Sequence, residues 1–311
     1  MSQRVVYLNG SFVREADARL SIYDSASIMG DAVFEVTRTF YHRPFRLRYH
    51  LERLAHSLSV LQIDPGLSLD ELEALTVETL ARNLPTEDSS IDWNIIHNIS
   101  RGPARDFLAS FAPDERRATV VISCYPLTWK LAALATAFDT GLDLVVPNQR
   151  ALPGDLLDSS IKTRSRVHYQ LATLQAQAKA PGAFAVLIDP DGFLTEGTSA
   201  NIFLVRDGRI RTPSLRNVLP GVTRGLIFEL AQRLGVPCTE ANLTPFDAAQ
   251  ADEIFMTSTS IGVLHARSFE GKPVGTGQMG PITSRLRSAL TAEVGVDIAS
   301  QAIAYAQALR K

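Results

Sequence analysis

The strand patterns of this chain stop at Pro126 and begin again only at Leu142, which divides the chain into two halves. Each half has the length of a domain, and an apolar content of 45% supplies side chains for a core in both. Strand and helix patterns occur in each half. We therefore predict an α+β fold with an N-terminal domain at residues 1–125, a linker at 126–134 and a C-terminal domain at 135–311.

Strands come first in the N-terminal half. Asn9-Gly10 accepts positive φ and joins two short alternating runs in a hairpin. A run rich in Val, Phe and Thr follows, and a turn at residues 42–44 leads into a further short strand. The predicted strands of this half are 5–8, 12–13, 32–40, 45–47, 93–100 and 118–125.

Two helices are predicted between these strands. In LERLAHSLSVL the apolar residues recur at helical spacing over Leu51–Leu61, which leaves Arg53 on a different face near the helix start. A second helix runs from Ser68, which forms a capping box with Glu71, to residue 84. In the C-terminal half we predict strands at 142–147, 183–189, 192–195, 201–205, 209–212 and 254–257 and helices at 169–179, 223–234 and 284–294.

Charge and composition favour small molecules as partners. The net charge is −2 and no long Lys/Arg run occurs, which argues against nucleic acid or an anionic membrane. Met1 leads directly into an alternating stretch, and no apolar run approaches the length of a membrane span, so we expect a cytoplasmic protein. Cys124 and Cys238 lack CxxC spacing and are expected to be free thiols, with no metal site.

A lysine and a glutamate carry the main chemical hypothesis. Lys162 follows a loop and precedes a predicted helix, a position from which a scaffold presents a side chain to a cleft, although a solvated basic loop is the simpler alternative. Glu196 follows a predicted strand and leads into a Gly-Thr-Ser turn. A lysine amine forms an imine with pyridoxal phosphate, and a carboxylate keeps the cofactor's ring nitrogen protonated. The pair therefore predicts a site for this cofactor.

Three segments are predicted to hold the phosphate group. In LPGVTR, at residues 219–224, a loop enters a helix whose free N–H groups bind anions. Arg53 would add a bidentate charged contact, and Thr259 in MTSTS would add a hydroxyl and a backbone N–H. Each of these segments is common in proteins, and their combination carries the prediction.

Together, YLNGSFV, GDAVFEVTRTF, HLERL, SSIK, EGTSANIF, LPGVTR and FMTSTS resemble the fold type IV, or class IV, aminotransferases over nearly the whole chain. The resemblance implies an α+β N-terminal domain, a larger C-terminal domain with a barrel-like β core, pyridoxal 5'-phosphate and a homodimer. By that likeness Lys162 matches the Schiff-base lysine and Glu196 the partner of the ring nitrogen. The phosphate contacts are matched by Arg53, Val222, Thr223 and Thr259, and Ser260 lies near the substrate carboxylate.

The resemblance implies ping-pong transfer of an amino group from an amino acid to a 2-keto acid, with a branched-chain L-amino acid as the expected donor. Branched-chain enzymes usually carry tyrosines where this chain has Met29 and Val167. Arg101, in an RG pair, resembles the D-amino acid transaminases, but their histidine is replaced by Pro103. The remaining candidate substrate contacts are Phe34, as a pocket wall, and Arg38, Arg164 and Arg166, which with Arg101 are candidate carboxylate clamps.

Three alternatives stay open at this point. A D-amino acid or (R)-amine transaminase would use the same residues on another donor. A lyase of the aminodeoxychorismate type would release pyruvate without an acceptor. A non-catalytic binding protein on the same fold would need neither Lys162 nor Glu196, and their presence argues against it.

Overall fold

A computed structural model describes residues 3–309. Contacts divide the chain into two compact units. The first extends to Trp129 and includes Ile161–Ser165, and the second comprises Lys130–Ser160 and the residues from Arg166 onward. Residues 126–134, the predicted linker, form the end of a strand, helix α4 (Thr128–Leu131) and a 3-10 turn at Ala132–Leu134.

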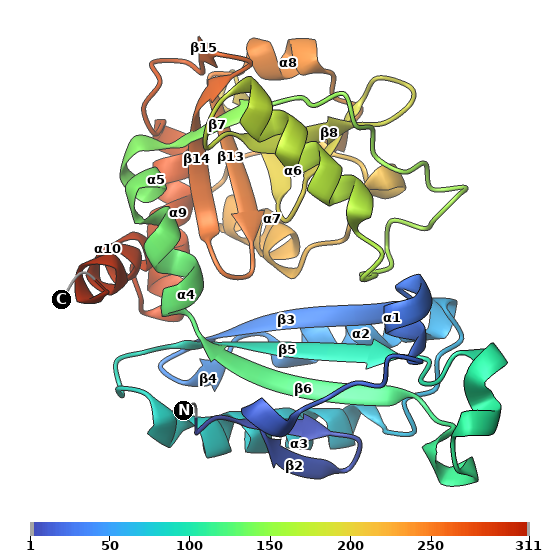
Figure 1. The fold of residues 1–311 in the computed structure, drawn as a ribbon. Helices are drawn as coiled ribbons and strands as arrows, with labels where there is room; N and C mark the ends of the chain where they lie inside the picture. The colour runs from blue at the N-terminus through green and yellow to red at the C-terminus, as the bar shows by residue number, and fades with distance from the viewer. Residues whose placement is uncertain (1–2, 310–311) are drawn as a thin grey trace. The chain divides into compact units, whose positions relative to one another are not determined.

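The first unit is built on a six-stranded antiparallel sheet in the order β2-β1-β6-β5-β3-β4 (Figure 1). Asn9 and Gly10 have positive φ and form the predicted hairpin turn between β1 and β2. Strand β6 buries alternate residues, as expected of a sheet with one covered face. The strands are β1 (Val5–Leu8), β2 (Ser11–Arg14), β3 (Ala32–Phe40), β4 (Arg43–Pro44), β5 (Trp93–Ser100) and β6 (Thr119–Pro126).

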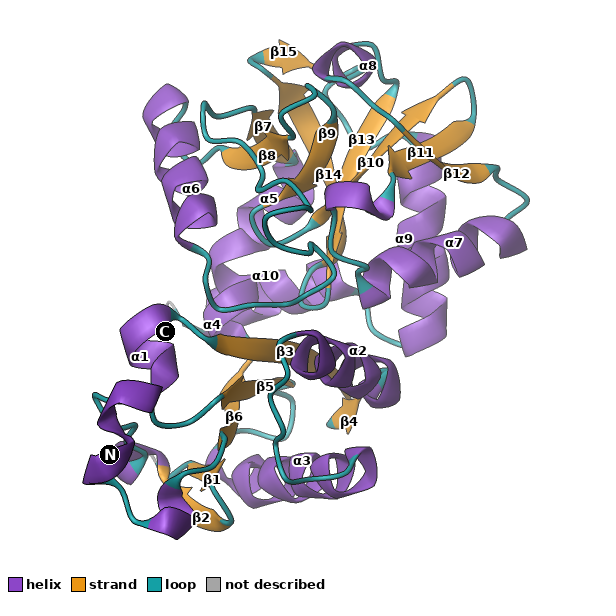
Figure 2. Ribbon diagram, turned by 90° about the vertical axis from the view of Figure 1, so that its right-hand side faces the viewer, coloured by secondary structure: helices purple, strands orange, loops and turns teal. Residues whose placement is uncertain are grey.

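Helices α2 (Leu47–Val60) and α3 (Leu69–Asn83) cover one face of this sheet (Figure 2). Helix α2 packs on β3, and α3 packs on β6 and β1. Leu51 and Leu54 of α2 and Leu72 of α3 are fully buried beneath them. The capping box of Ser68 and Glu71 is confirmed. Helix α1 (Ser25–Met29) and 3-10 turns at Glu15–Asp17, Leu84–Thr86, Arg105–Ser110 and Pro113–Glu115 complete the unit.

The predicted strand at 45–47 is wrong. The strand is β4, at residues 43–44, and Arg46 adopts a left-handed conformation that ends the extended chain before α2 begins at Leu47. Because α2 begins four residues earlier than predicted, Arg53 lies in its second turn and not near its start. Leu47 is buried because it is the first residue of α2. The alternation of apolar residues at 45–47 was therefore due to the start of a helix and not to a strand.

The second unit contains a closed ring of strands. Strand β10 pairs with β13, followed in order by β14, β7, β8 and β9, and β9 pairs back with β10. Strands β11 and β12 extend from β10, and β15 pairs with β14. The expected barrel-like core is confirmed. The strands are β7 (Leu142–Val145), β8 (Phe184–Ile188), β9 (Leu194–Gly197), β10 (Asn201–Arg206), β11 (Arg209–Pro213), β12 (Cys238–Ala241), β13 (Glu253–Ser258), β14 (Gly262–Phe269) and β15 (Lys272–Pro273).

Helices surround this ring. Helix α6 packs on β8, α7 on β13, and α9 on β13 and β14. The helices are α5 (Ala135–Thr140), α6 (Val167–Lys179), α7 (Val222–Arg233), α8 (Pro245–Ala249), α9 (Pro281–Val294) and α10 (Ile298–Ala308), with a 3-10 turn at Leu215–Asn217. Within residues 3–309, no helix combines the length and the apolar content needed to cross a bilayer.

Candidate active site

Lys162 lies in an extended segment, Ile161–Ser165, that main-chain bonds hold against β3. The Phe34 N–H donates to Lys162 O at 2.9 Å, and the Arg164 N–H donates to Ala32 O at 2.8 Å. The Lys162 N–H also donates to Ser57 Oγ of α2, at 3.1 Å. These bonds to a strand and a helix fix the backbone from which the lysine side chain projects.

The Phe34 ring lies beneath two cationic side chains. Lys162 Nζ is 4.8 Å from the ring centroid, and the guanidinium carbon of Arg164 is 3.9 Å from it. The ring is buried, whereas Lys162 is half-buried and Arg164 exposed. Phe34, predicted as a pocket wall, is therefore the surface on which the lysine amine rests.

Arg53, on α2, forms a buried ion pair with Glu35, on β3. Its Nε and Nη2 donate to the two carboxylate oxygens of Glu35, at 2.8 and 2.6 Å, and His50 Nδ1 lies 3.0 Å from Glu35 Oε1. Burial opposes ionisation of Glu35, but the charges and hydrogen bonds of Arg53 and His50 outweigh it and hold the pKa of this carboxyl well below its usual value. The pair orients Arg53 rigidly, and its contact with a phosphate stays a prediction.

Two of the proposed carboxylate clamps make contacts within the first unit. Arg101 donates to Asp31 at 2.7 Å and to the carbonyls of Leu61 and Gln62 at 2.8 and 2.9 Å, so it ties the end of β5 to the C-terminus of α2. Its side chain is still exposed, and its role as a carboxylate clamp stays a prediction. Arg38 is 1% exposed and stacks on Phe40, 3.9 Å from the ring centroid, so we withdraw Arg38 as a substrate contact.

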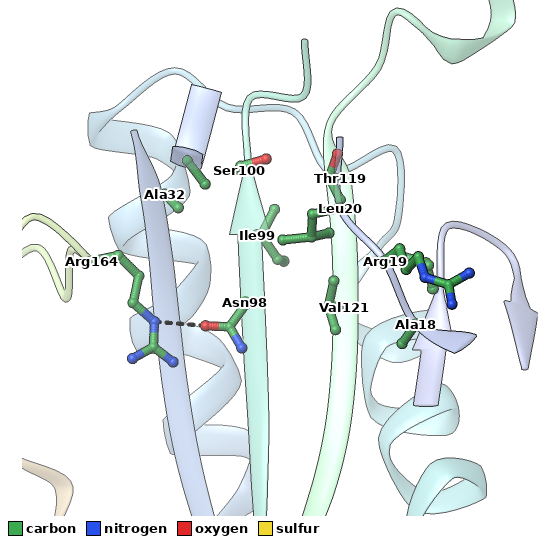
Figure 3. A pocket seen from close by; sticks show the side chains of 12 residues that line it. Ala18, Arg19, Leu20, Ala32, Asn98, Ile99, Ser100, Thr119, Val121 and Arg164 are labelled. Atoms are coloured by element: carbon green, nitrogen blue, oxygen red, sulfur yellow. Dashed lines mark hydrogen bonds between the residues drawn. The ribbon is translucent and has the colours of Figure 1, made fainter. Parts of the chain in front are cut away.

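Arg164 borders a cavity of about 350 Å³ on the sheet face opposite α2 and α3 (Figure 3). Arg164 Nε donates to Asn98 Oδ1 at 2.7 Å, which aims its side chain across β3 toward β5. Met29, at the end of α1, is 63% exposed and does not line this cavity. Apolar surface predominates in the lining, which is formed by Leu8, Ala18, Arg19, Leu20, Ala26, Ala32, Asn98, Ile99, Ser100, Thr119, Val121 and Arg164.

Glu196 is a buried carboxylate on β9 of the second unit, and three separate segments donate to it. The Tyr169 hydroxyl donates to Oε1 at 2.9 Å. Asn201 Nδ2 and the Leu219 N–H donate to Oε2, at 3.0 and 3.2 Å. Donors from a helix, a strand and a loop suit an ionised carboxylate and fix the plane in which it lies.

Asn201 links Glu196 to the neighbouring strand. It pairs with Glu196 on β9 and with Thr257 on β13, and side chains of directly paired residues lie on the same face of a sheet. Thr257 Oγ1 is buried and has no hydrogen-bond partner among residues 3–309. One face of the ring therefore presents the Glu196 carboxylate, the Asn201 amide and the Thr257 hydroxyl side by side on three neighbouring strands.

Helix α7 begins beside the same amide. Its N-cap, Gly221, offers no side chain to the free N–H groups of the first turn, which include those of Val222 and Thr223. A Cβ at Gly221 would lie 2.1 Å from Asn201 Oδ1, so only glycine lets the helix start approach this closely. The result is an uncapped helix start, of the kind that suits an anion, connected to the buried carboxylate through Asn201.

Thr259 and Ser260 form the turn between β13 and β14. They directly follow the strand that carries Thr257, and Ser260 is buried. The structure thus places both at the end of β13, the strand that pairs with the strand of Asn201. Their roles stay predictions.

The donor set of the second unit fits pyridoxal phosphate. The buried carboxylate suits the N–H of a pyridinium ring, and the uncapped helix start suits a phosphate. Two features are not required by packing alone: the Thr257 hydroxyl, which has no partner within the described part of the chain, and the close approach of Gly221 to Asn201. In the first unit, Lys162 supplies an amine on a fixed backbone.

Sequence reasoning missed Tyr169 and Asn201, side chains that donate hydrogen bonds to Glu196. Tyr169 was predicted only as the beginning of a helix, and Asn201 only as the beginning of a strand. A signal existed for each: a phenol in the first turn after the lysine segment, and an amide at the start of the strand after the glutamate turn. Arg166, beside Tyr169, donates to the Thr198 carbonyl, and its substrate role stays a prediction.

Comparisons with known proteins bear on this site. The family model described as Amino-transferase class IV matches residues 32–269. A Methanocaldococcus jannaschii protein, provisionally named a branched-chain-amino-acid aminotransferase, is 32% identical over 287 residues, which are 91% of this chain and 93% of that protein. The structure of a T.th. branched-chain amino acid aminotransferase with pyridoxamine 5'-phosphate is 28% identical, covers 94% of this chain and 95% of its own, and has a TM-score of 0.83. The same enzyme complexed with N-(5'-phosphopyridoxyl)-L-glutamate is 27% identical, with 95% of each chain covered and a TM-score of 0.83.

Proposed function

The chain belongs to the family of class IV aminotransferases, and on that premise we propose that it moves the amino group of a branched-chain L-amino acid to a 2-keto acid in a ping-pong cycle. Membership of the family makes the protein an enzyme that uses pyridoxal 5'-phosphate. When bound, this cofactor withdraws electrons from the Cα of the attached amino acid. The remaining roles fall to residues of the chain.

Glu196 holds the proton of the cofactor's ring nitrogen in this proposal. The observation that carries it is the buried carboxylate with three donors, joined through Asn201 to the free N–H groups at the start of α7. A carboxylate fixed in this way keeps positive charge on a pyridine ring, which favours loss of the Cα proton. A merely structural acid would need no adjoining anion site.

Lys162 is the amine that holds the cofactor between turnovers and moves the proton when substrate has displaced it. Its Nζ would take up the proton of the substrate Cα and deliver it again later in the cycle. A backbone held to both β3 and α2 supports this task, because proton transfer requires a fixed position. The Phe34 ring beneath it limits where the amine can lie.

Val222 and Thr223 would bind the phosphate with their backbone N–H groups. We assign Arg53 and Thr259 as further phosphate contacts and Ser260 as a residue near the substrate carboxylate. Arg101, Arg164 and Arg166 are the remaining candidates for that carboxylate once the buried Arg38 is withdrawn. Arg53 is suited to its role because Glu35 fixes its guanidinium.

The choice of substrates rests on the named relatives. The M. jannaschii and T.th. proteins are named for branched-chain amino acids, and one complex of the T.th. enzyme contains a phosphopyridoxyl derivative of L-glutamate. We therefore propose leucine, isoleucine or valine as donor and 2-oxoglutarate as acceptor. The homodimer and the cytoplasmic location expected from the sequence stay predictions.

A transamination panel tests this function. Purified protein with added pyridoxal phosphate is offered L- and D-amino acids and simple amines, each with 2-oxoglutarate or pyruvate. We expect L-glutamate from 2-oxoglutarate with branched-chain L-amino acids, and no more than one keto acid per cofactor when the acceptor is left out. Transfer from D-amino acids or (R)-amines only, or release of pyruvate from an aminodeoxychorismate-type substrate without an acceptor, would replace this proposal with the corresponding alternative.

A further inference from the structure

Tyr169, in the second unit, holds one of the two carboxylate oxygens of Glu196, and Asn201 holds the other. Its hydroxyl donates to Oε1 at 2.9 Å, whereas Asn201 and the Leu219 N–H both donate to Oε2. The last torsion of a glutamate side chain is broad, so bonds to one oxygen alone leave the carboxylate free to turn. The bond from Tyr169 restrains the second oxygen and with it the carboxylate plane.

The Tyr169 ring is itself fixed by its surroundings. It lies in the first turn of α6 and packs on the core around Ala172 and Ala176. The guanidinium carbon of Arg166 lies 4.3 Å from its ring centroid, and Arg166 is held in turn by the Thr198 carbonyl. The hydroxyl is thus delivered from a rigid helix and not from a loop.

The Tyr169 hydroxyl also stays protonated and can therefore donate to Glu196. Burial, and next the negative charge of Glu196, raise the pKa of Tyr169 well above its usual value, although Arg166 acts in the opposite direction. Tyr169 therefore keeps its proton over the pH range in which enzymes work. Val167, two residues earlier in the same turn of α6, is 73% exposed and offers no hydroxyl.

We propose that Tyr169 is a positioning residue of the aminotransferase reaction, whose hydroxyl fixes the Glu196 carboxylate in the plane that receives the ring N–H of the cofactor. The inference rests on the proposed role of Glu196. It predicts that Tyr169 matters only for a ligand that has a ring nitrogen. A residue that merely supported the fold would matter for every ligand of the site.

A binding experiment on the full chain, freed of cofactor by dialysis, separates these cases. Pyridoxamine 5'-phosphate, which forms no bond with a lysine, is titrated into wild type and Tyr169→Phe by calorimetry. The same is done with its 1-deaza analogue, in which a C–H replaces the ring nitrogen. Tyr305→Phe, which removes a phenol hydroxyl from the buried side of α10, is the matched control.

We expect Tyr169→Phe to raise the Kd of pyridoxamine 5'-phosphate about tenfold, as for loss of a hydrogen bond to a charged group. The Kd of the deaza analogue should change less than about twofold, because that ligand offers Glu196 no N–H. Tyr305→Phe should alter neither. An equal loss for both ligands, or none for either, would overturn the role of Tyr169. Failure of the wild type to bind either ligand would instead contradict the proposed function.

Discussion

Glu196 and Lys162 each take their geometry from residues on other segments of the chain. Their own motifs suggested both residues, whose roles stay predictions, but no motif indicated these partners. Tyr169 is distant from Glu196 in the sequence, and only the packing of α6 against the strand ring brings its hydroxyl to the carboxylate. The same holds for Arg101, whose partners Asp31, Leu61 and Gln62 lie on segments far from it in the chain.

Glu196→Gln should separate cofactor attachment from turnover. The amide keeps the size of the side chain but cannot hold the ring nitrogen in its protonated form. We expect kcat to fall by about 10² to 10³, as when one electrostatic partner of a transition state is lost, while the protein stays yellow. The matched control is Glu293→Gln, a surface residue paired with Arg233, which should leave kcat unchanged. Normal turnover by Glu196→Gln would remove Glu196 from the site.

His97 makes the stability of the first unit depend on pH. Thr76 Oγ1 donates its only proton to Leu72 O, so it must accept from His97 Nε2–H, and the buried Nδ1 has no partner among the described residues. Burial lowers the pKa of His97 to about 4. An unfolded histidine takes up its proton near pH 6.5. The stability due to the neutral ring is therefore complete above about pH 6.5 and is lost as the pH falls toward 4.

This effect is measurable by urea unfolding between pH 7 and 4. The wild type should lose on the order of 3 kcal/mol of unfolding free energy through His97 over this range. In His97→Gln the amide can still donate to Thr76 but does not titrate. The unfolding free energy of this variant should therefore fall less than that of the wild type, by the contribution of His97. His56→Gln changes an exposed histidine of α2 and should follow the wild type. Equal pH slopes in all three proteins would contradict the buried neutral state of His97.

At the scale of elements, most segments with an unbroken pattern were predicted, whereas β14, helix α10 and the short strand at 43–44 were not. Strand β3 and helix α3 were predicted because each carries an unbroken pattern or a cap. The strand at 45–47 failed because three residues cannot distinguish alternation from a helix start. Strand β14 was not predicted because His265 and Arg267 interrupt its apolar run, although its pairing with β13 and β7 makes it part of the ring.

The start of α7 permits a paired test of phosphate binding. In Gly221→Ala the new Cβ meets Asn201 Oδ1, so either the helix start or the amide must move. We expect the Kd of pyridoxamine 5'-phosphate to rise about tenfold, the equivalent of one charge-assisted hydrogen bond. Gly225→Ala, in the same helix with nothing within 4 Å, should leave the Kd unchanged and raise the unfolding free energy by up to about 1 kcal/mol.

Calorimetric titration and urea unfolding of the two variants give both quantities. Equal Kd values for Gly221→Ala and the wild type would show that the first turn of α7 does not bind the phosphate. A higher Kd for pyridoxamine 5'-phosphate in Gly225→Ala would show instead that any change to this helix affects the site.

At the scale of the molecule, the family resemblance predicted a barrel-like core, but no local pattern predicted which strands close it. The barrel closes through the pairing of Glu196 with Asn201 and the parallel pairing of β7 with β14, contacts that no local pattern encodes. The segment of Lys162 illustrates the same limit. It belongs to the first unit because Thr163 bridges to Val33, although it follows the first stretch of the second unit in the sequence.

The central claim is that one amine, that of Lys162, holds pyridoxal phosphate. The direct measurement is borohydride reduction of the purified, cofactor-loaded protein, followed by digestion and mass spectrometry. We predict a phosphopyridoxyl group on the peptide that carries Lys162, and no reducible yellow colour in Lys162→Ala. A group found on Lys130, Lys179 or Lys272, or no adduct at all in a protein supplied with excess cofactor, would contradict the account.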